Sequence, residues 1–415
     1  MPEATTQHVD LADRIRALRM SRGLTQEELA DASGVSVGVV RKIEQGGTAR
    51  METYHALARA LGVVTMTFVA AGPPEPVLDG PPDVMLAPIR AAVAPAMNLR
   101  GEPMFGTADA AELSLSRLAA TVSAVSAIYH SNRYDDLAQL LPPLLLSTQH
   151  HVTHLDDGPT RADALRLRAN AYNLAARYLI QVRAHDLALI AVQRCQQDAL
   201  TIGNTSILSA AISVQAWAMM RQGRFKEIVD LCSHAADELE PRMSRATPDE
   251  LTSWGVLLGR ASTAAARDNR PDEAEEFANL SILAGERIGH EYYGGLEAGD
   301  RSFGPLTAAF SRTENAMVAG DPGLAVRLFA KIPRTAGEVV SSTWNRALLD
   351  EARAHVQVGD ADRATDIMTG LRLKAPEWLR YQQLGHDTTR EIVGTAKRKL
   401  TDEQRALVDF FSITD

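Results

Sequence analysis

The stretch GVSVG, from Gly34 to Gly38, fits the pattern G-x-S-x-G. In some enzymes this pattern forms a strained turn that presents a nucleophilic serine, here Ser36, directly after a buried strand. The residues that follow include two adjacent cations, Arg41 and Lys42. Cations on an exposed helix are suited instead to phosphate oxygens and the edges of bases. The elements around Ser36 decide between these two chemistries.

The residues before Ser36 predict a helix and not a strand. Thr25 is a good N-cap, and Glu28 three residues later completes a capping box for the helix QEELADAS, which Gly34 ends. A nucleophile elbow needs a strand there, and no Asp or His partner of a triad stands out in the sequence. We therefore expect Ser36 to have no catalytic role and the chain not to be an enzyme.

Residues 1–70 predict a compact helical unit. A first helix within DLADRIRALRMSRG has apolar residues at helical spacing and ends at Gly23. Ser36 caps a third helix, which Gly46 and Gly47 end. A fourth helix lies within METYHALARALGV, and a short fifth lies around TMTFVA. The residues expected to face inward are Leu11, Ile15, Leu18, Val40, Ile43, Tyr54, Leu57 and Leu61.

The segment from Leu24 to Gly46 resembles the phage-repressor type of helix-turn-helix, the Cro/repressor or XRE family. The residues that carry this resemblance are Gln26, Ala30, Gly34, Val40, Ile43, Glu44 and Gly46. In this geometry the second helix of the motif enters the major groove of double-stranded DNA. Its outward positions are expected to be Ser36, Val37, Gly38, Val39, Arg41 and Lys42.

The resemblance also assigns roles to residues that flank the reading helix. It implies that Gln26 binds a phosphate and orients this helix, and that Thr48 and Arg50 meet the DNA backbone. It further implies a structural salt bridge between Arg19 and Glu44. Val37 and Gly38 occupy positions where longer polar side chains commonly contact bases, so discrimination is expected to rest on Arg41, Lys42 and DNA shape.

Composition and charge indicate the general class of protein. The chain has 415 residues, 45% of them hydrophobic and 23% charged, which is typical of a folded protein of more than one domain. It has no apparent signal peptide or membrane span, and its two cysteines, Cys195 and Cys232, are expected to be buried thiols in a cytoplasmic protein. The net charge is −9, yet residues 1–70 carry eight basic and eight acidic residues. Their balance leaves a DNA-binding face possible.

Six prolines between Pro73 and Pro88 predict an extended spacer, and we place a Pro-rich linker at residues 71–109. Residues 110–415 then predict a repeated pair of helices joined by a small or polar turn. The turns are SNRYDDLAQLL, VRAHDLALIAV, RQGRFKEIVDL, RDNRPDEAEEF, AGDPGLAVRLF and VGDADRATDIM. Spacings between turn residues Ala184, Gly223, Asn269, Gly320 and Gly359 are 39, 46, 51 and 39 residues. Thin helix pairs must stack to bury their apolar faces, so the fold class is all-α, with a curved solenoid.

Three segments of this region resemble the tetratricopeptide-like domain of actinobacterial XRE-type regulators. They are FGPLTAAFSR from Phe303, ALLDEARAHVQVGDADRA from Ala347, and KAPEWLRYQQLGHDTTREIV from Lys374. The resemblance implies control by a small-molecule or peptide effector, and regulation of secondary metabolism or development. It does not name the effector.

The first helix of each pair should line the inner surface of the solenoid, where polar and aromatic residues are candidates for effector binding. Asparagine amides can pair with a peptide backbone, and tryptophan can cover an apolar ligand. For each tryptophan, filling a gap between repeats is the alternative. The candidates are Asn170, Asn173, Gln215, Trp217, Trp254, Arg260, Phe303 and Trp344.

We expect neither a metal nor another cofactor. In QHHVTHLDD, His150 and His154 would share a helical face near Asp157, but a zinc site needs three or four ligands in a closed shell. HEYYG, from His290, begins like a zincin helix but has Gly294 where the second histidine would stand.

These features together predict a homodimeric transcriptional regulator that binds a palindromic operator and responds to an effector. The alternative is a tetratricopeptide-type scaffold or antitoxin-like adaptor whose main partners are proteins.

Overall fold

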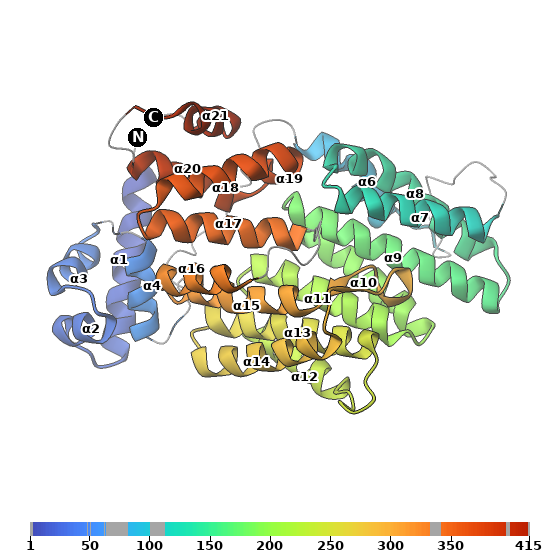
Figure 1. The fold of residues 1–415 in the computed structure, drawn as a ribbon, viewed down its shortest axis with the longest axis horizontal. Coiled ribbons are helices and arrows are strands. Elements are labelled where there is room, and N and C mark those ends of the chain that lie inside the picture. Colours follow the sequence, from blue (N-terminus) through green and yellow to red (C-terminus); the bar gives the residue numbers. More distant parts are fainter. Residues whose placement is uncertain are drawn as a thin grey trace.

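The chain folds almost entirely into α-helices, as predicted. The computed structural model describes residues 3–47, 49, 51–61, 63, 82–99, 113–332, 342–395 and 399–413. The strands in these residues are two short ones, β1 (Tyr292–Tyr293) and β2 (Ser302–Phe303), which pair antiparallel. In Figure 1 an N-terminal group of small helices, the head, lies at one end of a larger helical body.

The head contains α1 (Glu3–Ser21), α2 (Gln26–Ser33), α3 (Val37–Glu44) and α4 (Met51–Ala60). Its core contains the inward residues predicted on the third and fourth helices, with Ile15 of the first; Leu11 and Leu18 pack against it, half-buried. Leu29 and Ala30 of α2, for which no inward position was predicted, complete this core. α1 starts seven residues before the predicted helix at Asp10. The predicted fifth helix around TMTFVA lies outside the described residues.

The start of the predicted linker is also outside the described residues, but part of it is a helix, contrary to our expectation. α6 (Pro82–Val93) contains Pro88 and buries Ile89, Ala92 and Val93 in the main core of the body. Its apolar face can pack against α8 and α10, and this burial outweighs the backbone hydrogen bond that Pro88 removes. The helical body therefore begins near residue 82 and not near residue 110.

The six predicted turns each join two helices. Each turn contains one residue with a left-handed backbone: Asn132, Arg183, Gly223, Asn269, Gly320 and Gly359. The amide after this residue donates to a carbonyl five positions earlier, as in Ala184 N to Leu179 O at 2.8 Å and Asp360 N to His355 O at 2.8 Å. This Schellman arrangement ends the first helix of each pair and aims the second back along it. The pairs are α7 (Leu115–His130) with α8 (Tyr134–His154), α9 (Pro159–Gln181) with α10 (His185–Thr201), α11 (Thr205–Arg221) with α12 (Phe225–Glu238), α13 (Pro248–Arg267) with α14 (Pro271–Ile288), α15 (Pro305–Val318) with α16 (Pro322–Lys331), and α17 (Ser342–Gln357) with α18 (Ala361–Lys374).

An insertion explains the longest spacing between turns. Residues 289–304, between α14 and α15, form β1, the 3-10 turn η1 (Leu296–Ala298) and β2. Asp300 in this insertion is buried and accepts hydrogen bonds from Ser126, Tyr293 and Arg177. The insertion is thereby anchored to α7 and α9 inside the body.

The helical pairs do not form an open solenoid, because the C-terminal helices pack back onto the first pairs (Figure 1). After α18 come α19 (Pro376–Arg380), α20 (Gln383–Thr395) and α21 (Asp402–Phe410). One continuous hydrophobic core joins residues 89–218 to residues 349–407, and Trp378 on α19 is buried in it. Polar bonds reinforce this closure, since Gln382 Nε2 donates to Gln181 Oε1 at 3.0 Å and Asp135 N donates to Glu377 Oε2 at 3.0 Å.

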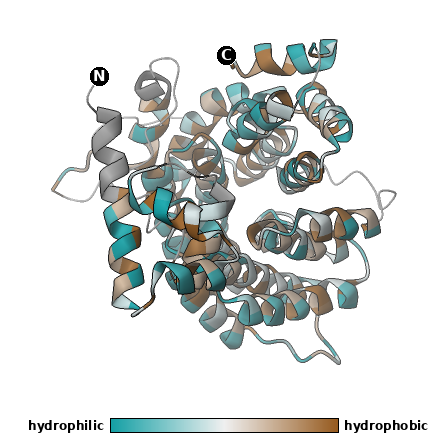
Figure 2. Cartoon of the chain, turned by 90° about the vertical axis from the view of Figure 1, so that its left-hand side faces the viewer, coloured by the Kyte–Doolittle hydropathy of each residue, from teal (hydrophilic) through white to brown (hydrophobic). Residues whose placement is uncertain are grey.

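Individual helices of the body are amphipathic, with hydrophobic and hydrophilic residues alternating along them in Figure 2. No helix among the described residues is both long and apolar enough to cross a membrane. Cys195 and Cys232 are buried free thiols, as predicted, and burial raises the pKa of Cys232 to about 12.

The role of the left-handed residue in each turn can be tested by substituting a glycine there and comparing the free energy of unfolding. Gly359 has φ 88° and open space where a Cβ would lie, so Gly359→Ala should cost only backbone strain, about 1–2 kcal/mol. Gly370 on α18 also has open space but no left-handed backbone, so Gly370→Ala should stabilise the fold by about 0.5–1 kcal/mol. Urea unfolding of both variants measures the two effects. Equal effects of the same sign would contradict the assigned role of the turn.

Candidate nucleic-acid interface and ligand cavity

The turn between α2 and α3 has the geometry of a helix-turn-helix. The predicted capping box is present at the start of α2, with Thr25 Oγ1 accepting from Glu28 N and Glu28 Oε2 accepting from Thr25 N. Gly34 ends α2 with φ 68°. Ser36 then precedes α3 with an extended backbone, although its side chain makes no capping hydrogen bond.

This geometry rules out the nucleophile elbow at Ser36. The residues that would have to form a buried strand are the helix α2 and the turn after it. Ser36 is an exposed residue of a surface turn. We retain it only as a candidate for contact with DNA.

One face of α3 is exposed and carries both cations. Val40 and Ile43 are buried, and the opposite face presents Gly38, Arg41 and Lys42. Gln45, directly after α3, is exposed too, and at 100° per residue it falls on this same face. Gln45 was not among the predicted contact residues, although its spacing from Gly38 and Arg41 places it on the same helical face.

Two of the predicted outward residues are not fully outward. Val37 and Val39 are half-buried and pack against the core of the head. They flank the buried pair Val40 and Ile43 on the helix, so their apolar side chains are drawn toward the core. The candidate reading face is therefore Gly38, Arg41, Lys42 and Gln45, with Ser36 at its start. Thr48 and Arg50 lie outside the described residues.

The salt bridge predicted between Arg19 and Glu44 is present and ties α1 to α3. Arg19 Nε donates to Glu44 Oε1 at 2.7 Å, and Arg19 Nη2 donates to Glu44 Oε2 at 3.1 Å. Burial alone would raise the pKa of Glu44, but hydrogen bonds from Arg19 and Gln26 outweigh it and hold this pKa below its ordinary value. The pair holds the C-terminal end of α3 against α1.

Gln26 is engaged within the protein in this structure. Its Nε2 donates to Glu44 Oε2 at 2.7 Å, and its Oε1 accepts from Arg41 Nε at 3.3 Å. Arg41 also forms an ion pair with Glu27 at 2.6 Å, and both of these side chains are more than half exposed. An exposed pair of this kind is weak, so Arg41 can exchange Glu27 for a phosphate at little cost.

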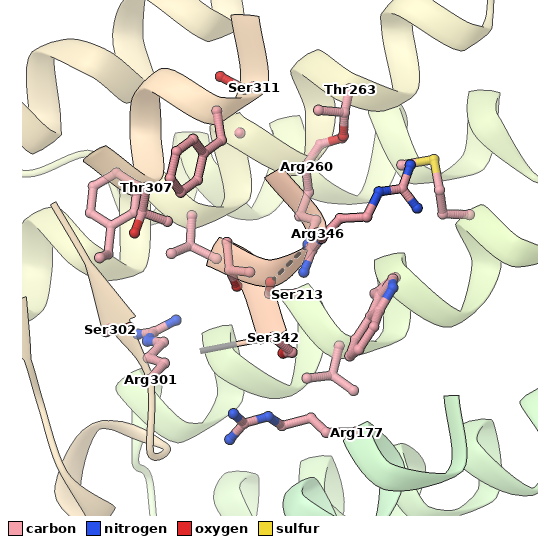
Figure 3. Close-up of a pocket in the computed structure, with 18 of the residues that line it drawn as sticks. Arg177, Ser213, Arg260, Thr263, Arg301, Ser302, Thr307, Ser311, Ser342 and Arg346 are labelled. Atoms are coloured by element: carbon pink, nitrogen blue, oxygen red, sulfur yellow. Dashed lines mark hydrogen bonds between the residues drawn. The ribbon is translucent and has the colours of Figure 1, made fainter. Parts of the chain in front are cut away.

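A cavity of about 320 Å³ lies inside the closed ring of the body (Figure 3). Its lining comes mainly from the first helices of the pairs, α7, α9, α11, α13, α15 and α17, and from the insertion. Ring closure turns the inner surface predicted for an open solenoid into the wall of this cavity. Phe303 in the wall rests against Gly255, where a Cβ would come within 2.4 Å of its ring.

Four of the eight predicted effector residues line the cavity: Asn173, Trp217, Arg260 and Phe303. Among them, Asn173 Nδ2 also donates to Gly299 O of the insertion at 3.3 Å.

The other four predicted effector residues do not line this cavity. Asn170 donates to Leu296 O at 2.9 Å, so its amide already binds the backbone of the chain's own insertion. Gln215 accepts from Gln196 at 2.7 Å. Trp254 fills the core between helix pairs, the alternative considered for tryptophans. The ring of Trp344 lies 5.6 Å from that of Phe310, and both residues line a smaller pocket.

Most of the cations in the cavity wall were not predicted from the sequence. Five further arginines line it: Arg177, Arg221, Arg267, Arg301 and Arg346. A signal was present at two turns, where Arg221 and Arg267 each stand two residues before the left-handed position. An arginine there reaches inward from the last turn of a first helix.

The histidine-rich segment gives no three-ligand group. The rings of His150 and His154 are 4.2 Å apart, and Asp157 is paired with Arg161. In the part of the chain that the structure describes, no group of three or more metal-binding side chains is found.

Comparison with known proteins identifies the type of domain that the head forms. Residues 15–69 match the family model described as Helix-turn-helix. The head is thus a helix-turn-helix domain of the kind that the XRE resemblance indicated, a class of domain found in DNA-binding regulators. A search of curated proteins finds no match to the chain. The match does not extend to the helical body.

The lowered pKa of Glu44 predicts acid sensitivity of the head. A carboxyl whose pKa is lowered by folding stabilises the native state above its ordinary pKa, and this contribution is lost as the pH falls through the lowered value. In Glu44→Gln, the amides of α3 should have lower protection factors at pH 7, and the further loss of protection below about pH 4.5 should be smaller than in the parent. Exchange followed by mass spectrometry over residues 26–45 measures this. Identical profiles for the two proteins would refute the structural role of the pair.

Proposed function

We propose that this chain is a sequence-specific transcriptional regulator that binds DNA as a homodimer and senses a small-molecule or peptide effector through its helical body. The observation that carries the proposal is the helix-turn-helix head with α3 presenting Arg41 and Lys42 to solvent. The cavity in the body supports a ligand-binding role for the second domain. Control of secondary metabolism or development, a role outside enzymes and a cytoplasmic location are parts of the same proposal.

The distribution of charge between head and body fits DNA binding by the head and ligand binding by the body. The chain carries a net charge of −9, while the segment containing the head has equal numbers of acidic and basic residues. An acidic body repels DNA outside the reading face, so contact with the duplex is confined to the head. Gly38, at the centre of the exposed face, lets backbone and bases approach α3 closely.

A dimer follows from the size of the head. One head offers few cations to phosphates, so its binding alone is weak and depends strongly on salt. Two heads placed about 34–36 Å apart meet successive major grooves on one side of the duplex. A palindromic operator is then the expected target, and the body would provide the surface that joins two copies.

The head contacts the body next to the ends of α13 and α15, two helices that line the cavity. Arg59 Nη1, at the end of α4, donates to Ala319 O at 3.2 Å, and Asn269 Nδ2 donates to Arg59 O at 3.2 Å. Asn269 and Ala319 lie just beyond α13 and α15, and these two helices are joined in the cavity wall by the pair of Arg267 with Glu314. A ligand that shifts α13 against α15 would therefore disturb the contact with Arg59.

DNA binding is tested with duplexes selected by the full-length protein from a random-sequence pool. Arg41→Ala and Lys42→Ala should each weaken binding to the selected site by about 1–3 kcal/mol, roughly 5–150-fold. Arg133→Ala and Lys226→Ala, exposed cations on the body, are matched controls and should leave affinity unchanged. Glu27→Gln, which frees Arg41, should strengthen binding to all sequences.

Enrichment of a dyad-symmetric site supports the regulator. If no sequence is enriched, or if the variants on α3 behave like the controls on the body, the reading face is wrong and a protein-binding adaptor becomes the better explanation.

Coupling between head and body is tested by hydrogen exchange without knowledge of the effector. Because linkage is reciprocal, operator DNA should change exchange at residues 268–270 and 319–321 in the parent protein. The double variant Arg59→Ala/Asn269→Gly should lose this change, since glycine keeps the left-handed turn (φ 59° at Asn269) and removes both hydrogen bonds of the contact. Unaltered exchange in the parent on DNA binding would exclude this route.

A further inference from the structure

Six arginines line the cavity, together with two carboxylates among the described residues. The arginines are Arg177, Arg221, Arg260, Arg267, Arg301 and Arg346, and the carboxylates are Glu314 and Asp350. They come from α9, α11, α13, α15, α17 and the insertion, and Figure 3 shows four of the arginines around one space. A protein with an overall excess of acid has thus gathered cations around an internal space.

Three of these arginines are neutralised by carboxylates. Arg177 Nη1 lies 2.9 Å from Asp300, Arg267 Nη2 lies 2.5 Å from Glu314, and Arg346 Nη2 lies 3.1 Å from Asp350. The first two pairs join different elements of the body, and the third lies within α17. In each pair the carboxylate neutralises the charge of the arginine. They behave as structural ion pairs.

The other three, Arg221, Arg260 and Arg301, have no such partner. Within the described residues, no carboxylate oxygen lies within 4.0 Å of their guanidinium groups. Arg260 donates to Ser213 Oγ at 3.3 Å and lies 5.8 Å from the ring centroid of Trp217. Arg301 donates to the hydroxyls of Ser209 and Ser253. Hydroxyl groups satisfy hydrogen bonds, but they do not neutralise a charge.

The cavity wall carries more cations than carboxylates. Burial lowers the pKa of Arg301 to about 10 and also lowers the pKa of Arg260, and it outweighs the opposite effects of the Asp249 carboxylate on Arg301 and of the Glu314 carboxylate on Arg260. Burial alone would raise the pKa of Glu314, but Arg267, Arg346 and Arg260 hold it at about 2. Withdrawing a cation from water without a directly paired carboxylate is costly.

We infer that this cavity binds a small molecule bearing an oxyanion, a carboxylate or a phosphate, held by Arg260 and Arg301. Guanidinium groups form paired, charge-assisted hydrogen bonds with both kinds of oxyanion. Hydroxyls of Ser213, Thr263 and Ser342 line the same space and can complete the shell of donors.

The rest of the ligand is apolar and small. Trp217, Phe303 and Phe310 contribute aromatic surface to the wall. The volume of about 320 Å³ lies at the lower end of the range of roughly 300–1,000 Å³ for small-molecule sites. A ring or short chain carrying one anionic group fits this combination. This inference deepens the proposed effector site, and it rests on that proposal only in treating the ligand as an effector.

The test uses three probes of similar shape on the full-length protein at low ionic strength. Phenyl phosphate represents the phosphates, 3-phenylpropanoate represents the carboxylates, and 3-phenylpropanamide is the neutral control. At least one anion should bind with a dissociation constant below about 1 mM by calorimetry and raise the thermal midpoint, while the amide should do neither. The anion that binds more tightly identifies the class of natural ligand.

Variants separate a ligand-binding arginine from a structural one. Arg260→Gln and Arg301→Gln should weaken the anion by about tenfold or more. Without the probe they should unfold at the same temperature as the parent or higher, because each removes a partly desolvated charge that has no directly paired carboxylate. Arg267→Gln should instead lower the midpoint without the probe, since it leaves Glu314 unpaired. Arg133→Gln, on the surface of the body, should change nothing.

Two results would overturn the inference: no binding of either anion, or binding that persists undiminished in both Arg260→Gln and Arg301→Gln. Equal binding of the amide would overturn it as well, because charge would then play no part. Failure of the proposed function can be distinguished from failure of this inference. An anion that binds but leaves the affinity for the selected operator unchanged keeps the ligand site and refutes its role as an effector site.

Discussion

The hydrophobic contact between the two ends of the helical body is the constraint on which the remaining architecture depends. Trp378 and its neighbours on α19–α21 share one core with α6–α11, although more than 150 residues separate them in the chain. Helix pairs that stack in one direction leave two unsatisfied apolar ends. Here those ends cover each other, so the inner faces of the first helices surround the cavity.

Closure changes the electrostatics of the inner surface. In an open solenoid, arginines such as Arg260 and Arg301 would be surrounded by water and would need no partner. In the ring both side chains are partly buried and lose part of this water, so a cation that is inexpensive on the surface becomes more costly to keep. Half of the arginines in the cavity wall receive a carboxylate from the protein, and the others are left for a ligand to neutralise. The cavity and its preference for anions are therefore products of the same closure.

Local features were predictable from the sequence, while features that depend on distant contacts were not. Thr25 with Glu28, Gly34, and the six turns lie within a few residues of the helices they delimit, so short-range hydrogen bonding specifies them. The pair of Arg19 with Glu44 was predicted through family resemblance, since no local rule links residues 25 positions apart.

Three features escaped prediction for the same physical reason. The proline count near Pro88 argued against a helix, but burial of Ile89 and Val93 by the body overrode that local preference. The insertion at residues 289–304 captured Asn170 and Asn173, which had been assigned to a ligand. The arginines of the cavity look like ordinary surface residues until ring closure brings six of them together.

Among the described residues, the hydrogen bonds that join Arg59 of the head to the body are weak enough for a ligand to break. Two hydrogen bonds join Arg59 to the ends of α13 and α15, and each contributes about 0.5–1.5 kcal/mol. Allosteric coupling energies are typically about 1–3 kcal/mol, which is the same range. A ligand that moves α13 relative to α15 by binding Arg260 therefore need supply only part of its binding energy to release the head. A larger and more apolar contact would have fixed the head permanently, and no ligand of this size could have repositioned it.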